Sequence, residues 1–281
     1  MQSPITQVWD GEVHPLPIST DHGLVRMQVF MATQRSKANI RPESTAAMED
    51  VDFLIFPLAA LNAVLNRTPV DLKRFGGQVA LYPGLAKQVL DQCKSALPDV
   101  PLASMDEALL HLGVERVRVV LTTVLLREYC RSHVAPAAGH RFLQIAEATA
   151  QASESLARMT GYARPTRAYL AGLMHDAGKL VLVSSDPGSA DALLMDAQGS
   201  DAAAIERRRF GTDSTPSAEW LGEELRLPEN IVEAMVYHRF PQNARKDPQL
   251  ANIVALARWI AQEKIRRNDP EPCPGEMVRA D

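Results

Sequence analysis

A histidine–aspartate pair, His175-Asp176, lies inside an otherwise apolar stretch and is the feature of this sequence best suited to chemistry. Burying an ionisable side chain without a partner is costly, so both residues should find hydrogen-bonding partners in the fold. An imidazole nitrogen and a carboxylate oxygen are also common ligands of divalent cations. Lys179, four residues after His175, is expected one turn further along the same helix face. The pair therefore predicts either a metal site or a buried polar cluster.

The stretch around this pair predicts a buried helix over residues 169–183. Ala171 and Gly172 precede the pair and are small enough to let a neighbouring helix approach closely. An amphipathic helix is expected over residues 140–160, ending at Gly161. Its predicted buried stripe consists of Ile145, Ala148, Ala152 and Leu156.

The last helix is expected to begin at Asp247-Pro248, because proline at the first helical position loses no amide hydrogen bond. Helical spacing then continues along the segment. Its predicted buried stripe consists of Leu250, Ile253, Val254, Ala257, Ile260 and Ala261.

Helix start and stop signals also mark the first half of the chain. Asp71 is a predicted N-cap for a helix over residues 72–80. Ser104, with Glu107 three residues later, has the pattern of a capping box. Gly113 is expected to end the helix that Ser104 begins, as a glycine directly after a helix often does.

The sequence divides into regions of different composition. The alternating apolar residues of segment 25–31 favour a short strand, or equally an ordered tail laid over the domain. Residues 134–139 are predicted to be a linker between two helical lobes, and the end of the chain is expected to be a flexible tail. The predicted organisation is an N-terminal extension (1–45), a domain (46–267) with lobes 46–133 and 140–267, and a tail (268–281).

Composition favours an all-α fold. Aromatic residues make up only 5% of the 281 residues, whereas alanine and leucine are abundant. The formal net charge of −4 gives no general field for nucleic acid or an anionic membrane, so neither is an expected partner. Cys93, Cys130 and Cys273 have neither disulfide-framework nor zinc spacing, and no long apolar run is present, which favours a cytoplasmic location.

Several stretches together resemble the HDOD family, the HD-related output domains within the HD superfamily of helical proteins. They are residues 90–96, residues 105–118, residues 168–179 with the Ala-Gly-Leu-Met-His-Asp-Ala-Gly-Lys motif, and residues 227–238. The resemblance covers roughly residues 55–265. It implies a multi-helix, two-lobed HD-like bundle, and domains of this kind act as output or adaptor modules in bacterial signalling, including cyclic-di-GMP networks, motility and surface behaviour.

Active members of the HD superfamily hold one or two metal ions with histidine and aspartate residues from several helices. By resemblance, His175, Asp176 and His238 fall on positions of this ligand set. The other expected ligand positions carry Ile145, Ser214 and Arg258. Isoleucine cannot bind a metal, and a guanidinium repels a cation and does not deprotonate. The resemblance thus implies a degenerate HD centre formed by His175, Asp176, Lys179, Ser214, His238 and Arg258.

We therefore expect a non-catalytic signalling domain without a cofactor, whose partner is a protein of a bacterial pathway, with a nucleotide as a further candidate ligand. In this hypothesis Asp176 accepts from Arg258 or Lys179, and His175 bonds to Ser214 or a backbone group. The alternative is a metal-dependent phosphohydrolase or phosphodiesterase acting on a nucleotide. There His175, Asp176 and His238 would hold the metal and Lys179 would neutralise phosphate.

Overall fold

The computed structural model describes residues 46–100, 102–190, 193 and 201–268. These residues form helices and turns without any strand, which confirms the predicted all-α class. The strand proposed within residues 25–31 lies outside the described residues. Among the helices described, none combines the length and apolar character needed to cross a membrane.

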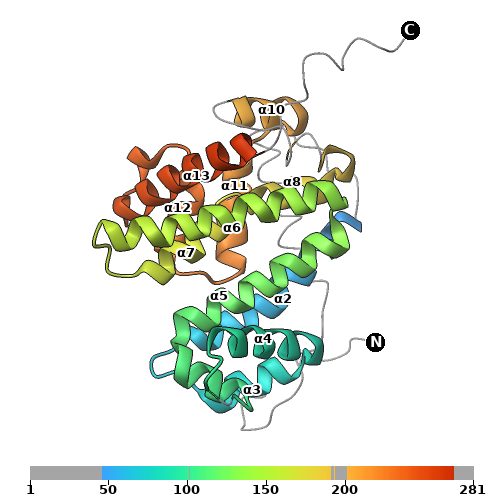
Figure 1. The fold of residues 1–281 in the computed structure, drawn as a ribbon. Helices are drawn as coiled ribbons and strands as arrows, with labels where there is room; N and C mark the ends of the chain where they lie inside the picture. Colours follow the sequence, from blue (N-terminus) through green and yellow to red (C-terminus); the bar gives the residue numbers. More distant parts are fainter. Residues whose placement is uncertain (1–45, 101, 191–192, 194–200, 269–281) are drawn as a thin grey trace.

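Helices account for most of the described chain, and short 3₁₀ turns, η1 (Pro187–Ser189) and η2 (Pro241–Asn243), supplement them. Helices α2 to α5 gather in one part of the molecule, whereas α6, α7, α11, α12 and α13 pack together in the other (Figure 1). The α-helices are α2 (Ala46–Leu65), α3 (Leu72–Ala80), α4 (Pro83–Ala96), α5 (Met105–His133), α6 (Pro136–Met159), α7 (Pro165–Met174), α8 (Gly178–Ser185), α10 (Asp201–Phe210), α11 (Ser214–Glu224), α12 (Glu229–Tyr237) and α13 (Pro248–Asn268).

The helix caps of the first half follow the sequence signals. The side chain of Asp71 accepts a hydrogen bond from the amide of Arg74 at 2.9 Å. Ser104 Oγ accepts from the amide of Glu107 at 3.2 Å, and the Glu107 carboxylate accepts from the amide of Ala103 at 2.7 Å. The carboxylate thus caps the residue before the N-cap, one position earlier than in a standard capping box. Gly113 interrupts α5 with φ 75° and ψ 165°, a conformation that a β-carbon would disfavour.

The segment between the two predicted lobes is mostly helical. Helix α6 begins at Pro136, so only Ala135 and its predecessor connect it to the end of α5 at His133. The linker predicted over residues 134–139 is therefore wrong for its last four residues. Proline at a helix start fixes φ near its helical value and has no amide hydrogen to lose, so the proline of this segment starts a helix rather than interrupting one.

The single helix predicted over residues 169–183 is also wrong, because the chain breaks it into α7 and α8. The turn between them bonds each amide to the carbonyl three residues earlier, from Ala177 to Met174 at 3.0 Å and from Lys179 to Asp176 at 2.9 Å. Such bonds wind the chain more tightly than an α-helix. His175 and Asp176 consequently lie in a turn between two helices.

Helices α6 and α7 pack at close range. A β-carbon on Gly172 would meet Ser153 Oγ at 2.5 Å and the Cα of Ala150 at 2.9 Å, so the predicted close approach is confirmed at this glycine. The stripe predicted for α6 is displaced by about one residue, because the residues used for it are only half-buried. The buried side of α6 consists of Ala138, Gly139, Phe142, Ala146, Thr149, Ala150, Ser153 and Ala157.

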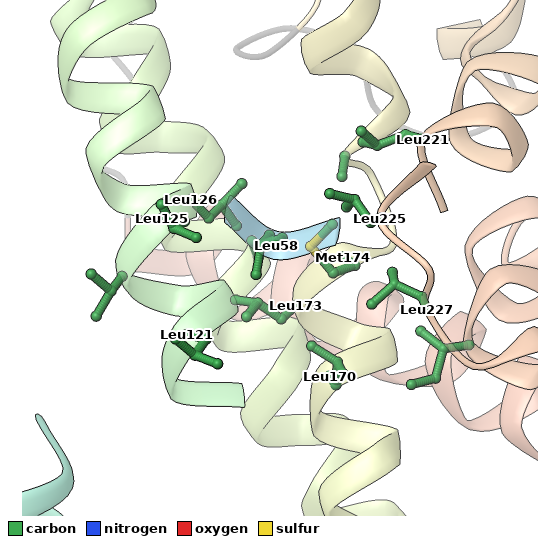
Figure 2. Packing of buried hydrophobic residues seen from close by; sticks show 14 of the residues in the cluster. Leu58, Leu121, Leu125, Leu126, Leu170, Leu173, Met174, Leu221, Leu225 and Leu227 are labelled. Atoms are coloured by element: carbon green, nitrogen blue, oxygen red, sulfur yellow. The ribbon is translucent and has the colours of Figure 1, made fainter. Parts of the chain in front are cut away.

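Leucine side chains from α2, α5, α7 and the region of α11 form the hydrophobic core beside this turn (Figure 2). Met174, directly before the histidine–aspartate pair, is fully buried among them. The final helix contributes most of its predicted stripe, although Ile260 is 37% exposed. Figure 2 labels Leu58, Leu121, Leu125, Leu126, Leu170, Leu173, Met174, Leu221, Leu225 and Leu227.

A polar network around the buried Arg118 joins α2 and α5 to the chain after α11. The Arg118 guanidinium, 2% exposed, donates to Asn62 Oδ1 at 2.5 Å and to Asn66 Oδ1 at 2.9 Å. The two asparagine amides donate onward to the carbonyls of Leu225 and Arg226 at 2.7 and 2.9 Å. Burial lowers the pKa of Arg118 to about 10. The arginine thus fixes two helices against a loop distant in sequence.

Candidate functional site

His175 lies at the end of α7 and uses one ring nitrogen to satisfy a carbonyl that the helix end leaves free. Its Nδ1 lies 2.7 Å from the carbonyl oxygen of Gly172, three residues earlier. A carbonyl only accepts, so Nδ1 carries the proton and Nε2 presents a lone pair. That Nε2 is buried, has no hydrogen-bond partner, and lies 3.5 Å from Asp176 Oδ2. Burial lowers the pKa of His175 to about 3, which keeps the ring neutral.

His238 repeats this arrangement at the end of α12. Its Nδ1 lies 2.8 Å from the carbonyl oxygen of Met235, and its Nε2 lies 3.3 Å from Asp176 Oδ1 without forming a hydrogen bond. The two imidazole rings meet edge to face with centroids 5.2 Å apart. Burial also lowers the pKa of His238, although Asp176 opposes the shift. Two bare imidazole nitrogens therefore face one carboxylate.

Asp176 is the centre of this cluster and is 6% exposed. Lys179 Nζ donates to its Oδ2 at 2.8 Å, and the lysine itself is 4% exposed. Burial by itself would raise the pKa of Asp176, but the nearby Lys179 ammonium, together with the Arg258 charge, holds the pKa well below its usual value. Asp176 is thus an ionised carboxylate whose principal counter-ion is Lys179.

A second ion pair, which the sequence reasoning missed, adjoins the first. Arg239 donates to both carboxylate oxygens of Glu206, at 2.8 and 3.2 Å, and its Nη2 lies 3.8 Å from Asp176 Oδ1. Glu206 is fully buried, whereas the three arginines that follow it in α10 are exposed. The available signal was spacing, since Glu206 falls on the same face of α10 as Ala202 and Ala203.

Ser214 belongs to this second pair and does not bond to His175. Its Oγ accepts from Arg239 Nη2 at 3.1 Å, and its amide donates to Glu206 Oε2 at 2.7 Å. Gly178, at the start of α8, makes the position possible, because a β-carbon there would meet the amide nitrogen of Ala218 in α11 at 2.7 Å.

Arg258, on α13, is 9% exposed and faces the centre closely enough to lower the pKa values of His175 and Asp176. Of the two expected donors to Asp176, Lys179 is confirmed, whereas Arg258 is wrong, since no carboxylate of the described residues lies within 4.0 Å of its guanidinium. Its Nε and Nη2 are buried without a hydrogen-bond partner. Lys179 takes the near side of the carboxylate because it is only three residues away along a tight turn.

The residues present do not fit a hydrolytic metal centre. His175, Asp176 and His238 supply three donor atoms, but Asp176 is already paired with an ammonium. The centre contains three cationic side chains, those of Lys179, Arg239 and Arg258. Two carboxylates of the described residues, those of Asp176 and Glu206, oppose them. In the part of the chain that the structure describes, no group of three or more histidine, cysteine, aspartate or glutamate residues is arranged to hold a metal ion. A divalent cation would add further positive charge to a centre with a net positive balance.

The other sequence candidates lie apart from this cluster or lack suitable chemistry. Ile145 is half-buried on α6 and offers only a hydrocarbon side chain. His140 is exposed on the same helix. Cys93 and Cys130 are buried, and burial raises their thiol pKa values to about 11 and about 12, so neither is a reactive thiolate.

Comparison with solved structures shows the same fold in several bacterial proteins. A protein from Shewanella amazonensis, provisionally named a phosphohydrolase, has 23% sequence identity and a TM-score of 0.59, with 80% of this chain and 83% of that chain covered. An HDOD domain protein of unknown function from Geobacter sulfurreducens has 20% identity and a TM-score of 0.58, with 89% and 80% covered. A protein from Marinobacter aquaeolei, provisionally named a signal transduction protein, has 19% identity and a TM-score of 0.57, with 88% and 56% covered.

No curated protein matches this chain. The family model of the HDOD domain, however, matches residues 57–241. That span runs from α2 to η2 and includes the histidine–aspartate turn, both ion pairs and His238. Together with the shared fold, this match shows that the chain belongs to the HDOD domain family.

Proposed function

We propose that this HDOD domain is a non-catalytic signalling output or adaptor module, which acts by binding a protein partner or a small ligand. The observation that carries the proposal is the charge of the centre. Lys179 occupies one oxygen of the Asp176 carboxylate, and Arg258 stands where the HD superfamily places an acidic metal ligand. Hydrolytic metal sites need at least three protein ligands and an open position, and here the third ligand is already neutralised.

The comparisons agree with a signalling role. The Marinobacter protein carries a signal transduction name, and the HDOD family is the one that the sequence motifs indicated. A surface of packed helices around a rigid polar core is suited to present a binding face. The proposed partner is a protein of a bacterial pathway, with cyclic-di-GMP networks as the setting that the family resemblance suggests.

A metal-dependent phosphohydrolase is the second candidate, and one observation favours it. Both histidines donate Nδ1 to a backbone carbonyl and leave Nε2 bare, the arrangement common among metal-binding histidines. The Shewanella relative also carries a phosphohydrolase name. In this alternative His175, Asp176 and His238 would hold the metal.

Two measurements on the purified chain decide between the candidates. Elemental analysis should find no stoichiometric Mn, Fe, Ni or Zn. A panel of cyclic dinucleotides and other phosphodiesters, with Mn²⁺ or Mg²⁺ added, should show no turnover above background. Turnover that disappears in Asp176→Ala, but persists in the matched surface variant Asp91→Ala, would establish the hydrolase instead.

A further inference from the structure

Helix α13 carries a stripe of exposed apolar side chains. Leu256, Trp259 and Ile260 are 49%, 63% and 37% exposed, and their spacing of three and four residues places them side by side on the helix. The other faces of α13 pack against α6, α7 and α12. A tryptophan exposed to this degree beside two aliphatic residues indicates a contact surface for another segment of chain.

The same stripe becomes basic toward the end of the helix. Lys264 follows Ile260 by four residues and Arg267 follows it by seven, so all three lie on one face. Both cations are exposed. Glu263 pairs with Arg266 and Arg267, so the end of the helix has three cations against one carboxylate, a net charge of +2.

The sequence that follows α13 has the complementary pattern. Residues 269–281 include four acidic residues and one arginine, a net charge of −3. Asp269 and Glu271 come first, and Pro274 and the apolar pair Met277-Val278 follow. A chain that turns back at the end of the helix therefore meets the basic residues with its acidic part and the apolar stripe with its apolar part.

The segment is also long enough to reach the stripe. Trp259 lies nine residues before the end of α13, a distance of about 14 Å at the helical rise of about 1.5 Å per residue. A proline-rich chain advances about 3.1 Å per residue, so about five residues span this distance and a returning chain passes the tryptophan near Cys273. Proline restricts the undocked chain, which reduces the entropy lost on docking.

A second copy of the chain fits this stripe less well. Stable interfaces bury about 800 Å² on each partner, and three side chains supply only part of that area. The other large hydrophobic residues exposed in the described part of the chain are single residues of α5, α6 and the positions next to α3 and η2. The size of the stripe instead matches a short segment of extended chain.

We propose that residues 269–281 fold back and dock on α13, where they cover Leu256, Trp259 and Ile260. The first acidic residues of the segment lie along the basic end of the helix, and its later residues lie on the apolar stripe. The segment is thus bound to its own domain rather than extending freely, as its composition alone predicts. This inference goes beyond the proposed function, because it assigns a contact surface outside the histidine–aspartate centre.

A label on Cys273 tests the docking in the whole chain. Burial raises the thiol pKa values of Cys93 and Cys130, so a thiol-reactive nitroxide is expected to modify Cys273 under native conditions, with Cys273→Ser as the labelling control. A nitroxide quenches tryptophan fluorescence at near contact, and Trp259→Phe identifies the share of the emission that comes from Trp259. That share should fall by at least about half, since a tethered segment has an effective concentration of about 1 mM.

Charge reversal tests the basic end of the stripe. Lys264→Glu should weaken the quenching about twofold, in line with the contribution of an exposed ion pair, and Glu271→Lys in the same chain should restore it. Lys94→Glu reverses an exposed lysine of α4 and should leave the quenching unchanged. Undiminished quenching in Lys264→Glu would refute docking along the basic end of α13.

Dilution and truncation separate this segment from other occupants of the stripe. Quenching that falls on dilution, together with a dimer in sedimentation, would show a second copy on the stripe and overturn the proposal. Deletion of residues 269–281 should raise the quenching of Trp259 by acrylamide, whereas deletion of residues 1–31 should not. The reverse result would place the N-terminal extension on α13 instead, and Trp259 emission that the label leaves unchanged would refute the docking outright.

Discussion

The buried pair between Asp176 and Lys179 offers the sharpest test of the centre, through a double-mutant cycle. Asp176→Asn keeps the shape of the side chain but leaves the ammonium of Lys179, 5% exposed at its side chain, without its carboxylate. Removing one partner of a buried ion pair costs about 3–5 kcal/mol, and we expect about 3 kcal/mol here. The Arg258 charge, which also lowers the pKa of Asp176, loses the same carboxylate.

Lys179→Met should cost less, about 2 kcal/mol, because the orphaned carboxylate still has Arg239 Nη2 at 3.8 Å and the Arg258 charge nearby. The methionine also retains most of the packing of the lysine stem. The double variant removes both charges, so it should lose about 3 kcal/mol rather than the sum of about 5 kcal/mol. The coupling of about 2 kcal/mol lies within the range measured for contacting residues.

The assay is urea denaturation of the four proteins at pH 7, followed by circular dichroism, with the free energy of unfolding taken from each transition. The control cycle uses Lys87 and Asp91, an exposed pair at 3.2 Å with side chains 82% and 55% exposed. Its coupling should not exceed about 0.5 kcal/mol. Losses that add within about 0.5 kcal/mol for Asp176 and Lys179 would refute the claim that they form a buried pair.

Three further predictions follow from the buried groups. Burial lowers the pKa of His175 from 6.5 to about 3. Between these two pH values the imidazole of residue 175 binds a proton in the unfolded chain but not in the folded chain, so the free energy of unfolding falls as the pH falls through this window. His175→Gln should reduce that slope by up to about 1.4 kcal/mol per pH unit in urea titrations, whereas the exposed His140→Gln should not. Gly172→Ala should lower the thermal midpoint by overpacking α6 against α7, at a cost of about 1–3 kcal/mol. The control Gly77→Ala, whose added β-carbon meets nothing within 4 Å, should be neutral or stabilising. Equal effects of the two substitutions would contradict the close contact at Gly172. Arg118→Met should cost about 2 kcal/mol of unfolding free energy by leaving the buried side-chain oxygen of Asn62 without a donor. An unchanged urea midpoint would show that the network carries no stability.

The helical class and the main caps could be predicted from the sequence because they depend on local physics. Asp71 and Ser104 cap helices through bonds to amides a few residues away, and Gly113 takes a positive φ that other residues avoid. The pairing of Lys179 with Asp176 is similarly local. The candidate residues themselves came from a resemblance carried by motifs that lie far apart in the sequence.

Helix junctions were predicted less well, because the same residues are compatible with more than one local structure. The proline and small residues of segment 134–139 suggested a linker, yet Pro136 starts α6. The apolar run over residues 169–183 suggested one helix, yet it is two helices separated by a tight turn. Gly172 in α7 packs closely against α6, and Gly178 in α8 packs closely against α11; a hydrophobicity pattern does not predict these contacts.

The sequence by itself determined that His175, Asp176, Lys179 and His238 belong to one HD-type centre in an all-α domain. Only the tertiary structure decided how the charges are distributed there. It brings Arg239 and Glu206 into the centre as a second pair and leaves Arg258 facing the cluster without a carboxylate. The physical reason is that an ion pair depends on the distance between the ends of its two side chains. The charged side chains of the centre come from five helices or the turns that follow them, and their distances are fixed by packing rather than by any local pattern of residues.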